Sequence, residues 1–157
     1  MTAFAKCRIK GPKAEEFLDN LVANKLPKKV GRINLCHALN TKGGVHSEFT
    51  IMRESENSFY LVSAGAFQRL DHDWILGWMP KDGSVQFENL TNSKGVLVVS
   101  GPKARELMQR VSNDDFSNEN FKWLSAKQVD VGFAPVNAMR VNFVGELGWE
   151  LHLSLIH

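Results

Sequence analysis

The chain has 157 residues, of which 43% are hydrophobic and 23% charged, as in an ordinary globular protein. Its formal net charge is only +2, so the composition gives no reason to expect a nucleic-acid or membrane-surface partner. No apolar run approaches the roughly 18 residues that a membrane-spanning helix needs, and the N-terminus does not resemble a signal peptide, so a cytoplasmic location is expected.

The first predicted elements are a strand and an amphipathic helix. Apolar side chains occupy every second position of residues 3–9, which is the period of a half-buried strand. Gly11-Pro12 ends this strand. Apolar side chains then recur at helical spacing over residues 14–22. We expect Pro12 at the first helical position, where its missing N–H has no partner to lose.

The first half continues with a strand pair and a second helix. Thr50–Arg53 and Ser58–Val62 are predicted to pair as two strands. An apolar stripe at helical spacing follows over residues 67–78 and stops at Met79-Pro80. The sequence therefore predicts that a helix closes this half.

The second half repeats the opening pattern. Val96–Val99 is predicted as a buried strand, and it is followed by Gly101-Pro102 and by apolar side chains at helical spacing over residues 104–111. Residues 112–120, rich in Asn, Asp and Ser, are expected to form an exposed loop. A strand pair is predicted to follow, Ala138–Phe143 with Trp149–Leu153.

These repeated elements predict an α+β fold with an internal duplication. Each half contains a strand, a Gly-Pro-Lys-Ala turn, a helix and a strand pair. We expect one lobe over residues 1–90 and a second, incomplete lobe over residues 91–157, which lacks the last helix of the first. The chain is therefore expected to be a piece of a longer protein.

The sequence shows no pattern typical of a metal site or of a dinucleotide site. Cys7 and Cys36 stand outside any CxxC or Cys/His ligand spacing, so reduced, buried thiols are expected. The five histidines show no paired metal-ligand spacing. No GxGxxG motif follows a predicted strand, so this segment is not expected to hold a dinucleotide by itself.

Two glycine-bearing turns with a carboxylate stand out, residues 40–48 and 145–150. Each by itself is also compatible with a hairpin that carries solvated charges. In the second turn, however, strand alternation places Glu150 and His152 on the face opposite Trp149. A carboxylate there is suited to accept two parallel hydrogen bonds from adjacent N–H groups, such as those of a pterin ring.

In the first turn, Glu48 precedes an apolar run. Its predicted role is to lie beside a reacting nitrogen and either to orient this nitrogen or to accept its proton. The alternative is a carboxylate at a strand edge without a catalytic role.

The chain resembles the folate-binding domain of the aminomethyltransferase (glycine-cleavage T-protein) family, and most closely its copy at the C-terminus of FAD-dependent sarcosine and dimethylglycine dehydrogenases. The resemblance runs along nearly the whole length, and the final segment is its most specific part. It is carried by Phe4-Ala5-Lys6, Gly11-Pro12, residues 24–27, 30–33 and 39–44, Gly101-Pro102-Lys103-Ala104, and residues 144–150.

The resemblance implies a fold in which two lobes and a further barrel hold tetrahydrofolate. The pterin-binding glutamate of the family falls on Glu150, and Phe143, Glu146 and Trp149 are the neighbouring candidates for cofactor binding. The catalytic carboxylate falls on Glu48, where the family usually has aspartate; the extra methylene moves the carboxylate, and such a displacement can lower a rate. T-proteins commonly have tyrosine and threonine where this chain has Phe143-Val144, which favours the dehydrogenase branch.

The function implied is one-carbon transfer to tetrahydrofolate, with an amine oxidised elsewhere by a flavin dehydrogenase domain or subunit. FAD is implied only for that absent upstream domain. Alternatives are a glycine-cleavage aminomethyltransferase, a folate-dependent demethylase, a non-catalytic folate-binding module or an inactive fragment. No nucleic-acid or membrane partner is expected.

Overall fold

The computed structural model describes residues 3–155. The described chain divides into two compact units, residues 3–91 and 92–155, called here the first and the second unit. No helix in the described range is long and apolar enough to cross a membrane. The predicted lobes, 1–90 and 91–157, stay a prediction about separately folding domains.

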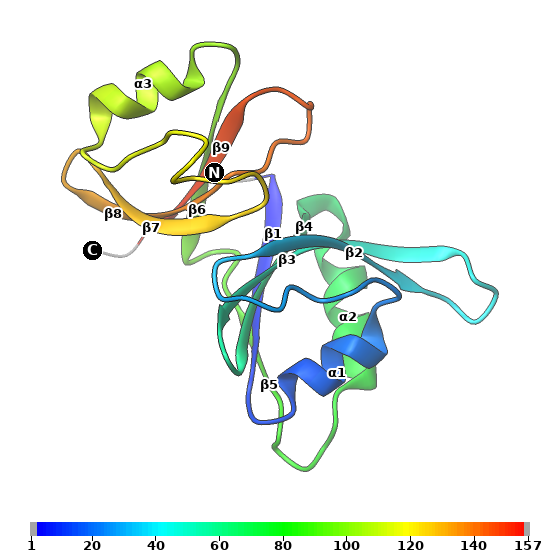
Figure 1. The fold of residues 1–157 in the computed structure, drawn as a ribbon. Helices are drawn as coiled ribbons and strands as arrows, with labels where there is room; N and C mark the ends of the chain where they lie inside the picture. The colour runs from blue at the N-terminus through cyan, green and yellow to red at the C-terminus, as the bar shows by residue number, and fades with distance from the viewer. Residues whose placement is uncertain (1–2, 156–157) are drawn as a thin grey trace. The chain divides into compact units, whose positions relative to one another are not determined.

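The first unit is a five-stranded antiparallel sheet with two α-helices (Figure 1). The strand order is β2-β3-β4-β1-β5. In chain order the elements are β1 (Phe4–Lys10), α1 (Ala14–Leu21), β2 (Ile33–Leu39), β3 (Val45–Ser55), β4 (Ser58–Ala64), a 3₁₀ turn η1 (Gly65–Phe67), α2 (Gln68–Trp78) and β5 (Gln86–Asn89).

The core of the first unit lies between the sheet and its helices. Both α1 and α2 cover the same face of the sheet (Figure 1). Leu18 of α1 and Ile75 of α2 are fully buried there against Phe49, Ile51 and Phe59 of β3 and β4. The period-two and helical patterns of the sequence bring these side chains to one layer, so burial of that apolar layer stabilises the unit.

The second unit is a four-stranded antiparallel sheet with one α-helix. The strand order is β6-β9-β8-β7. Its elements are β6 (Lys94–Ser100), α3 (Ala104–Val111), β7 (Ala126–Val131), β8 (Ala134–Met139) and β9 (Gly148–Ser154). Its core is built around Trp149, with Met108 of α3 and two loop residues, Phe116 and Phe121.

The predicted α+β fold class is confirmed, with two antiparallel sheets. Read in corresponding order, β2-β3-β4-β1 and β7-β8-β9-β6 describe the same arrangement. Gly11 and Gly101 also correspond: their φ angles are +132° and +122°, and each N–H donates to a loop carbonyl, of Asn57 and Leu147, at 2.9 Å. An internal duplication would produce this arrangement, although common descent of the two units stays a prediction.

Glycine is required at position 11 for two reasons. Its positive φ disfavours any other residue. A Cβ atom added there would also collide with the backbone carbonyl of Ser84. The helix that follows begins at Ala14, with Lys13 in a non-helical conformation before it, so the prediction of Pro12 at the first helical position is wrong. Pro12 lies instead in the turn closed by the hydrogen bond from Ala14 N to Gly11 O.

The predicted second strand pair is displaced at its first member. The strand expected over Ala138–Phe143 is β8, which ends at Met139. Val144 N donates to Asn142 Oδ1 at 2.8 Å, a local side-chain turn that competes with strand pairing. Phe143 therefore lies in the loop before β9, and β8 pairs on its other side with β7, a strand that we did not predict.

The strand predicted over Val96–Val99 forms, but it is not buried throughout. Leu97 and Val98 are 60% and 53% exposed. Within residues 3–155, β6 is an edge strand that pairs with β9 on one side. A continuous apolar run does not by itself distinguish an edge strand from a central one.

Both cysteines are free and buried, as predicted. Burial raises the pKa of the Cys7 thiol to about 12, with a contribution from the charge of Asp71, and burial raises that of Cys36 to about 11. Such thiols are poor nucleophiles. Within residues 3–155, no group of three or more His, Cys, Asp or Glu side chains is arranged to hold a metal ion.

Candidate functional site

Glu150 is a buried carboxylate in the middle of β9. It lies between Val98 of β6 and Met139 of β8 in the ladder. Its side chain is 8% exposed, and Oε2 is 3.2 Å from Nε2 of His152, which is 1% exposed. The period-two alternation of the strand places Glu150 and His152 on one face, as the sequence predicts.

One oxygen of Glu150 remains available to a ligand. Within residues 3–155, only His152 hydrogen-bonds to this carboxylate, through Oε2. Oε1 accepts no hydrogen bond from the described residues. A carboxylate has room for about four hydrogen bonds, so Glu150 keeps unused acceptor positions. The site is therefore suited to a ligand that presents N–H donors.

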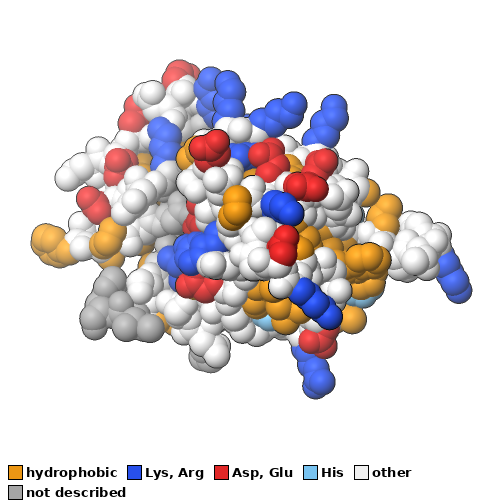
Figure 2. All heavy atoms as spheres, turned by 90° about the horizontal axis from the view of Figure 1, so that it is seen from below, with side chains coloured by type: hydrophobic (Ala, Val, Ile, Leu, Met, Phe, Trp, Pro, Cys, Tyr) orange, Lys and Arg blue, Asp and Glu red, His pale blue; other side chains and the backbone are white. Residues whose placement is uncertain are grey.

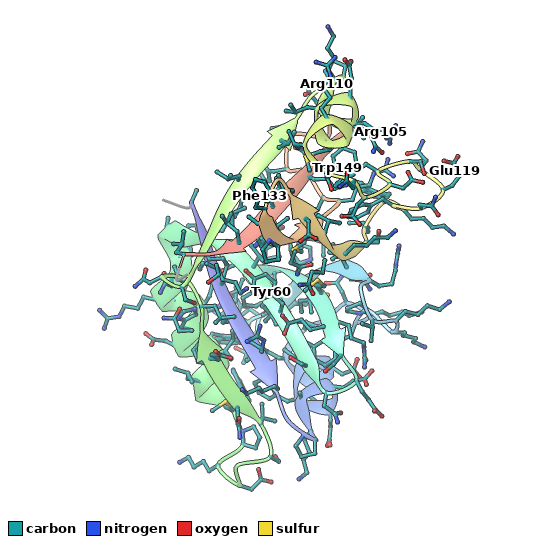
Figure 3. The ribbon with its side chains drawn as sticks, turned by 90° about the vertical axis from the view of Figure 1, so that its left-hand side faces the viewer. Tyr60, Arg105, Arg110, Glu119, Phe133 and Trp149 are labelled. Carbon is teal, nitrogen blue, oxygen red and sulfur yellow. The ribbon has the colours of Figure 1, made fainter. Side chains whose placement is uncertain are left out.

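Trp149 supports Glu150 from the opposite face of β9. Its ring is fully buried and makes edge contacts with Phe116 and Phe121, at centroid distances of 5.2 and 6.0 Å. The guanidinium groups of Arg105 and Arg140 lie 5.8 and 5.7 Å from the ring centroid, and Figure 3 shows Arg105 beside Trp149. From this position Trp149 holds the strand in place, and direct contact with a cofactor stays a prediction.

Phe143 and Glu146 lie in the loop between β8 and β9. Phe143 is 93% exposed, so its ring is available for stacking. Glu146 is also exposed, and its Oε2 accepts a long hydrogen bond of 3.5 Å from Ser100 Oγ. Their predicted role in cofactor binding stays a prediction.

Glu48 lies on β3, directly opposite His37 of β2 in the antiparallel ladder. Its Oε2 is 3.0 Å from His37 Nε2, and the two side chains are 54% and 30% exposed. The other ring nitrogen of His37, Nδ1, is 3.2 Å from Asn24 Oδ1, which also accepts the backbone N–H of His37 at 2.8 Å. Glu48 is thus part of a three-residue hydrogen-bonded chain.

His37 and Asn24 carry no motif that predicts a site, and the strand alternation places His152 beside Glu150 without predicting a role for it. The usable signal for His152 is its position two residues after Glu150 in a strand. For His37 the signal would have been the pairing register of β2 and β3, which requires the hairpin geometry.

A separate hollow of about 260 Å³ lies on the side of the first unit that carries the helices. Hydrophobic side chains gather on the face shown in Figure 2. Neither Glu48 nor Glu150 is among the residues that line the hollow. The lining residues are Phe17, Asn20, Leu21, Leu39, Asn40, Thr41, Trp74 and Trp78.

Comparison with known proteins places this geometry in a family. The chain matches the GCVT N-terminal domain family over residues 1–155. It is 39% identical to mitochondrial dimethylglycine dehydrogenase of Homo sapiens over 153 residues, which are 97% of this chain and 18% of that protein. Mitochondrial sarcosine dehydrogenase of Homo sapiens is 30% identical over 169 residues, 98% of this chain and 18% of that protein. The chain thus spans less than a fifth of the length of these two relatives.

The fold agrees with the sequence match. The crystal structure of glycine cleavage system aminomethyltransferase T from Bartonella henselae matches 97% of this chain and 40% of that chain, with a TM-score of 0.81 and 21% sequence identity. The family resemblance predicted from the sequence is confirmed. Because the family match covers nearly every residue, the chain belongs to the GCVT N-terminal domain family, as an aminomethyltransferase-like domain related to dimethylglycine and sarcosine dehydrogenases.

Proposed function

We propose that this chain is the tetrahydrofolate-binding, one-carbon-transfer segment of a dimethylglycine or sarcosine dehydrogenase-like enzyme. The observation that carries the proposal is the buried carboxylate of Glu150, which has one oxygen without a donor among the described residues, in a chain of this family. Oε1 is not one of the fully enclosed unpartnered atoms of the described residues, so a ligand N–H can reach it.

The proposed role of Glu150 is to bind the pterin ring of tetrahydrofolate. The ring amide and the amino group of a pterin present two adjacent N–H donors, which match the two oxygens of a carboxylate. Oε1 is open, and Oε2 keeps a lone pair beside its contact with His152. The residues present therefore fit the cofactor. Phe143, in the loop that leads into β9, adds an exposed aromatic ring.

The proposed role of Glu48 is to handle a proton at the reacting nitrogen. An exposed carboxylate that is also hydrogen-bonded to a histidine can accept a proton and then pass it on to water. Bound tetrahydrofolate would supply the one-carbon acceptor chemistry. The protein would contribute orientation and the placed carboxylate of Glu48.

The proposed partner is a flavin dehydrogenase domain or subunit that oxidises the amine. Its support is the similarity to two dehydrogenases of which this chain matches only 18% of the length. We propose that FAD belongs to that flavin domain or subunit and not to this chain. The cytoplasmic location stays a prediction; the two relatives are mitochondrial by name.

The test is calorimetric titration of the full chain with tetrahydrofolate. Wild type should bind saturably, and Glu150→Gln should weaken binding at least about tenfold, or about 1.4 kcal/mol, because the amide replaces one acceptor oxygen with a donor. The matched control is Glu119→Gln, the same change at an exposed loop position of the same unit (Figure 3). Equal affinities of wild type and Glu150→Gln, or no binding by a folded chain, would overturn the proposal.

A further inference from the structure

The hydrogen bonds around His37 determine which of its ring nitrogens carries a proton. The backbone N–H of His37 can only donate, so the Asn24 atom 2.8 Å away must be the amide oxygen. The same oxygen is 3.2 Å from Nδ1 of His37. Since an oxygen acceptor faces Nδ1, that nitrogen must carry the hydrogen. Asn24 thus selects the Nδ1–H form of the ring.

This leaves one proton between His37 and Glu48. With Nδ1 protonated, Nε2 of a neutral ring is an acceptor, and it lies 3.0 Å from Glu48 Oε2. Nε2 and Oε2 would both be acceptors and would repel each other at this distance, so a hydrogen must lie between them. The proton resides either on Nε2, as an imidazolium beside a carboxylate, or on Oε2, as a carboxylic acid beside a neutral ring.

We infer that His37 is a positioning residue that holds the proton of Glu48, with Asn24 fixing the ring form that makes this sharing necessary. The inference rests on the proposed role of Glu48 in one-carbon transfer. From the imidazolium–carboxylate state of the pair, a substrate N–H transfers its proton to Oε1 of Glu48, and the electron pair of the broken N–H bond stays on nitrogen. The pair then holds two protons, as imidazolium and carboxylic acid, and loss of one to water restores the resting state.

The surroundings of the pair suit this role. Glu48 is 54% exposed, and its Oε1 accepts no hydrogen bond from the described residues. Asn24 Oδ1 accepts the backbone N–H of His37 and contacts Nδ1 of its ring, and Glu48 contacts Nε2, so the ring cannot turn without breaking a hydrogen bond. An exposed pair of this kind contributes little to stability.

The first test is nitrogen-15 NMR of the full chain with labelled histidine, which reports the protonation of each ring nitrogen. In wild type, Nδ1 of His37 should carry a hydrogen, and the signal of Nε2 should report the proton shared with Glu48. Asn24→Ala should release the ring to the Nε2–H form, and Glu48→Gln should shift the Nε2 signal. The matched control is Asn20→Ala, whose amide donates to Glu16 O on α1 and should leave the His37 spectrum unchanged. A wild-type ring that carries hydrogen on Nε2 but not on Nδ1, or no effect of Asn24→Ala, would overturn the inference.

The second test separates this inference from the proposed function. Tetrahydrofolate is added to the same labelled samples. A shift at His37 Nε2 in wild type that Glu48→Gln abolishes supports both. Folate binding without any change at His37 overturns the role of His37 and leaves the proposed function intact. A chain that shows the predicted ring form and proton sharing but does not bind folate overturns the proposed function instead.

Discussion

The two units carry the same chemical pair in opposite environments. In the first unit, Glu48 and His37 face each other across β3 and β2 at 3.0 Å, with both side chains partly exposed. In the second, Glu150 and His152 lie two residues apart on β9 at 3.2 Å, and both are buried. The contact distance is nearly the same, so burial is the property that distinguishes the pairs.

Burial changes what a hydrogen bond is worth. An exposed pair competes with water at either partner, and its loss costs little. A buried pair has no water to replace the missing partner, and the remaining group bears its full desolvation cost. We therefore expect loss of the Glu150–His152 contact to lower both the free energy of unfolding and the affinity for a ligand. Loss of the Glu48–His37 contact should affect the proposed proton transfer and have little effect on stability.

The largest effect on stability is expected from Trp149→Ala, which tests what holds β9 in place. This fully buried ring packs against Phe116 and Phe121, so its removal should lower the free energy of unfolding by about 3–5 kcal/mol. Urea denaturation measures this. Phe133→Ala, at a fully exposed hairpin position of the same unit, is the control and should change stability by less than about 0.5 kcal/mol. A loss below about 1 kcal/mol for Trp149→Ala would mean that contacts on the polar face of β9, and not the packing of Trp149, hold the strand in place.

An intermediate effect is expected from His152→Leu. Leucine cannot donate to Glu150 Oε2, which is left buried and short of a hydrogen bond. The free energy of unfolding should fall by about 1–3 kcal/mol. If urea denaturation gives His152→Leu the same free energy of unfolding as wild type, burial does not make the Glu150–His152 pair more important for stability than the exposed pair.

The smallest effect is expected from His37→Leu, the same change in the exposed pair. Glu48 is then solvated by water, so the free energy of unfolding should fall by no more than about 1 kcal/mol in the same denaturation assay. A loss equal to that of His152→Leu would show that exposure does not separate the two pairs, and would assign His37 a structural role.

The sequence predicted most of the first unit because its elements have clear periods. The alternation over residues 3–9 became β1, and the helical stripes became α1 and α2. The predictions failed where local chemistry ended an element. Asn142 turns the chain before Phe143, and Gly11 and Lys13 delay the start of α1. These are single hydrogen bonds and dihedral angles that an apolar pattern does not encode.

In the candidate site too, the residues in a strand were predictable from their spacing, and the buried residue in a loop was not. Residues 112–120 were expected to be an exposed loop, yet Phe116 in it is fully buried beside Trp149. A loop has no period, so nothing local distinguishes a buried aromatic residue from an exposed one. In contrast, Glu150 and His152 were placed on one face of a strand by their spacing alone.

The sequence by itself determined the α+β class, the family, and the shared face of Glu150 and His152, because each follows from the order and spacing of residues along one chain segment. Only the tertiary structure decided the burial of that pair and the contact of Glu48 with His37 and Asn24. The physical reason is that burial depends on what packs around a strand, and that the Glu48 contacts depend on the register between two strands and the loop after α1.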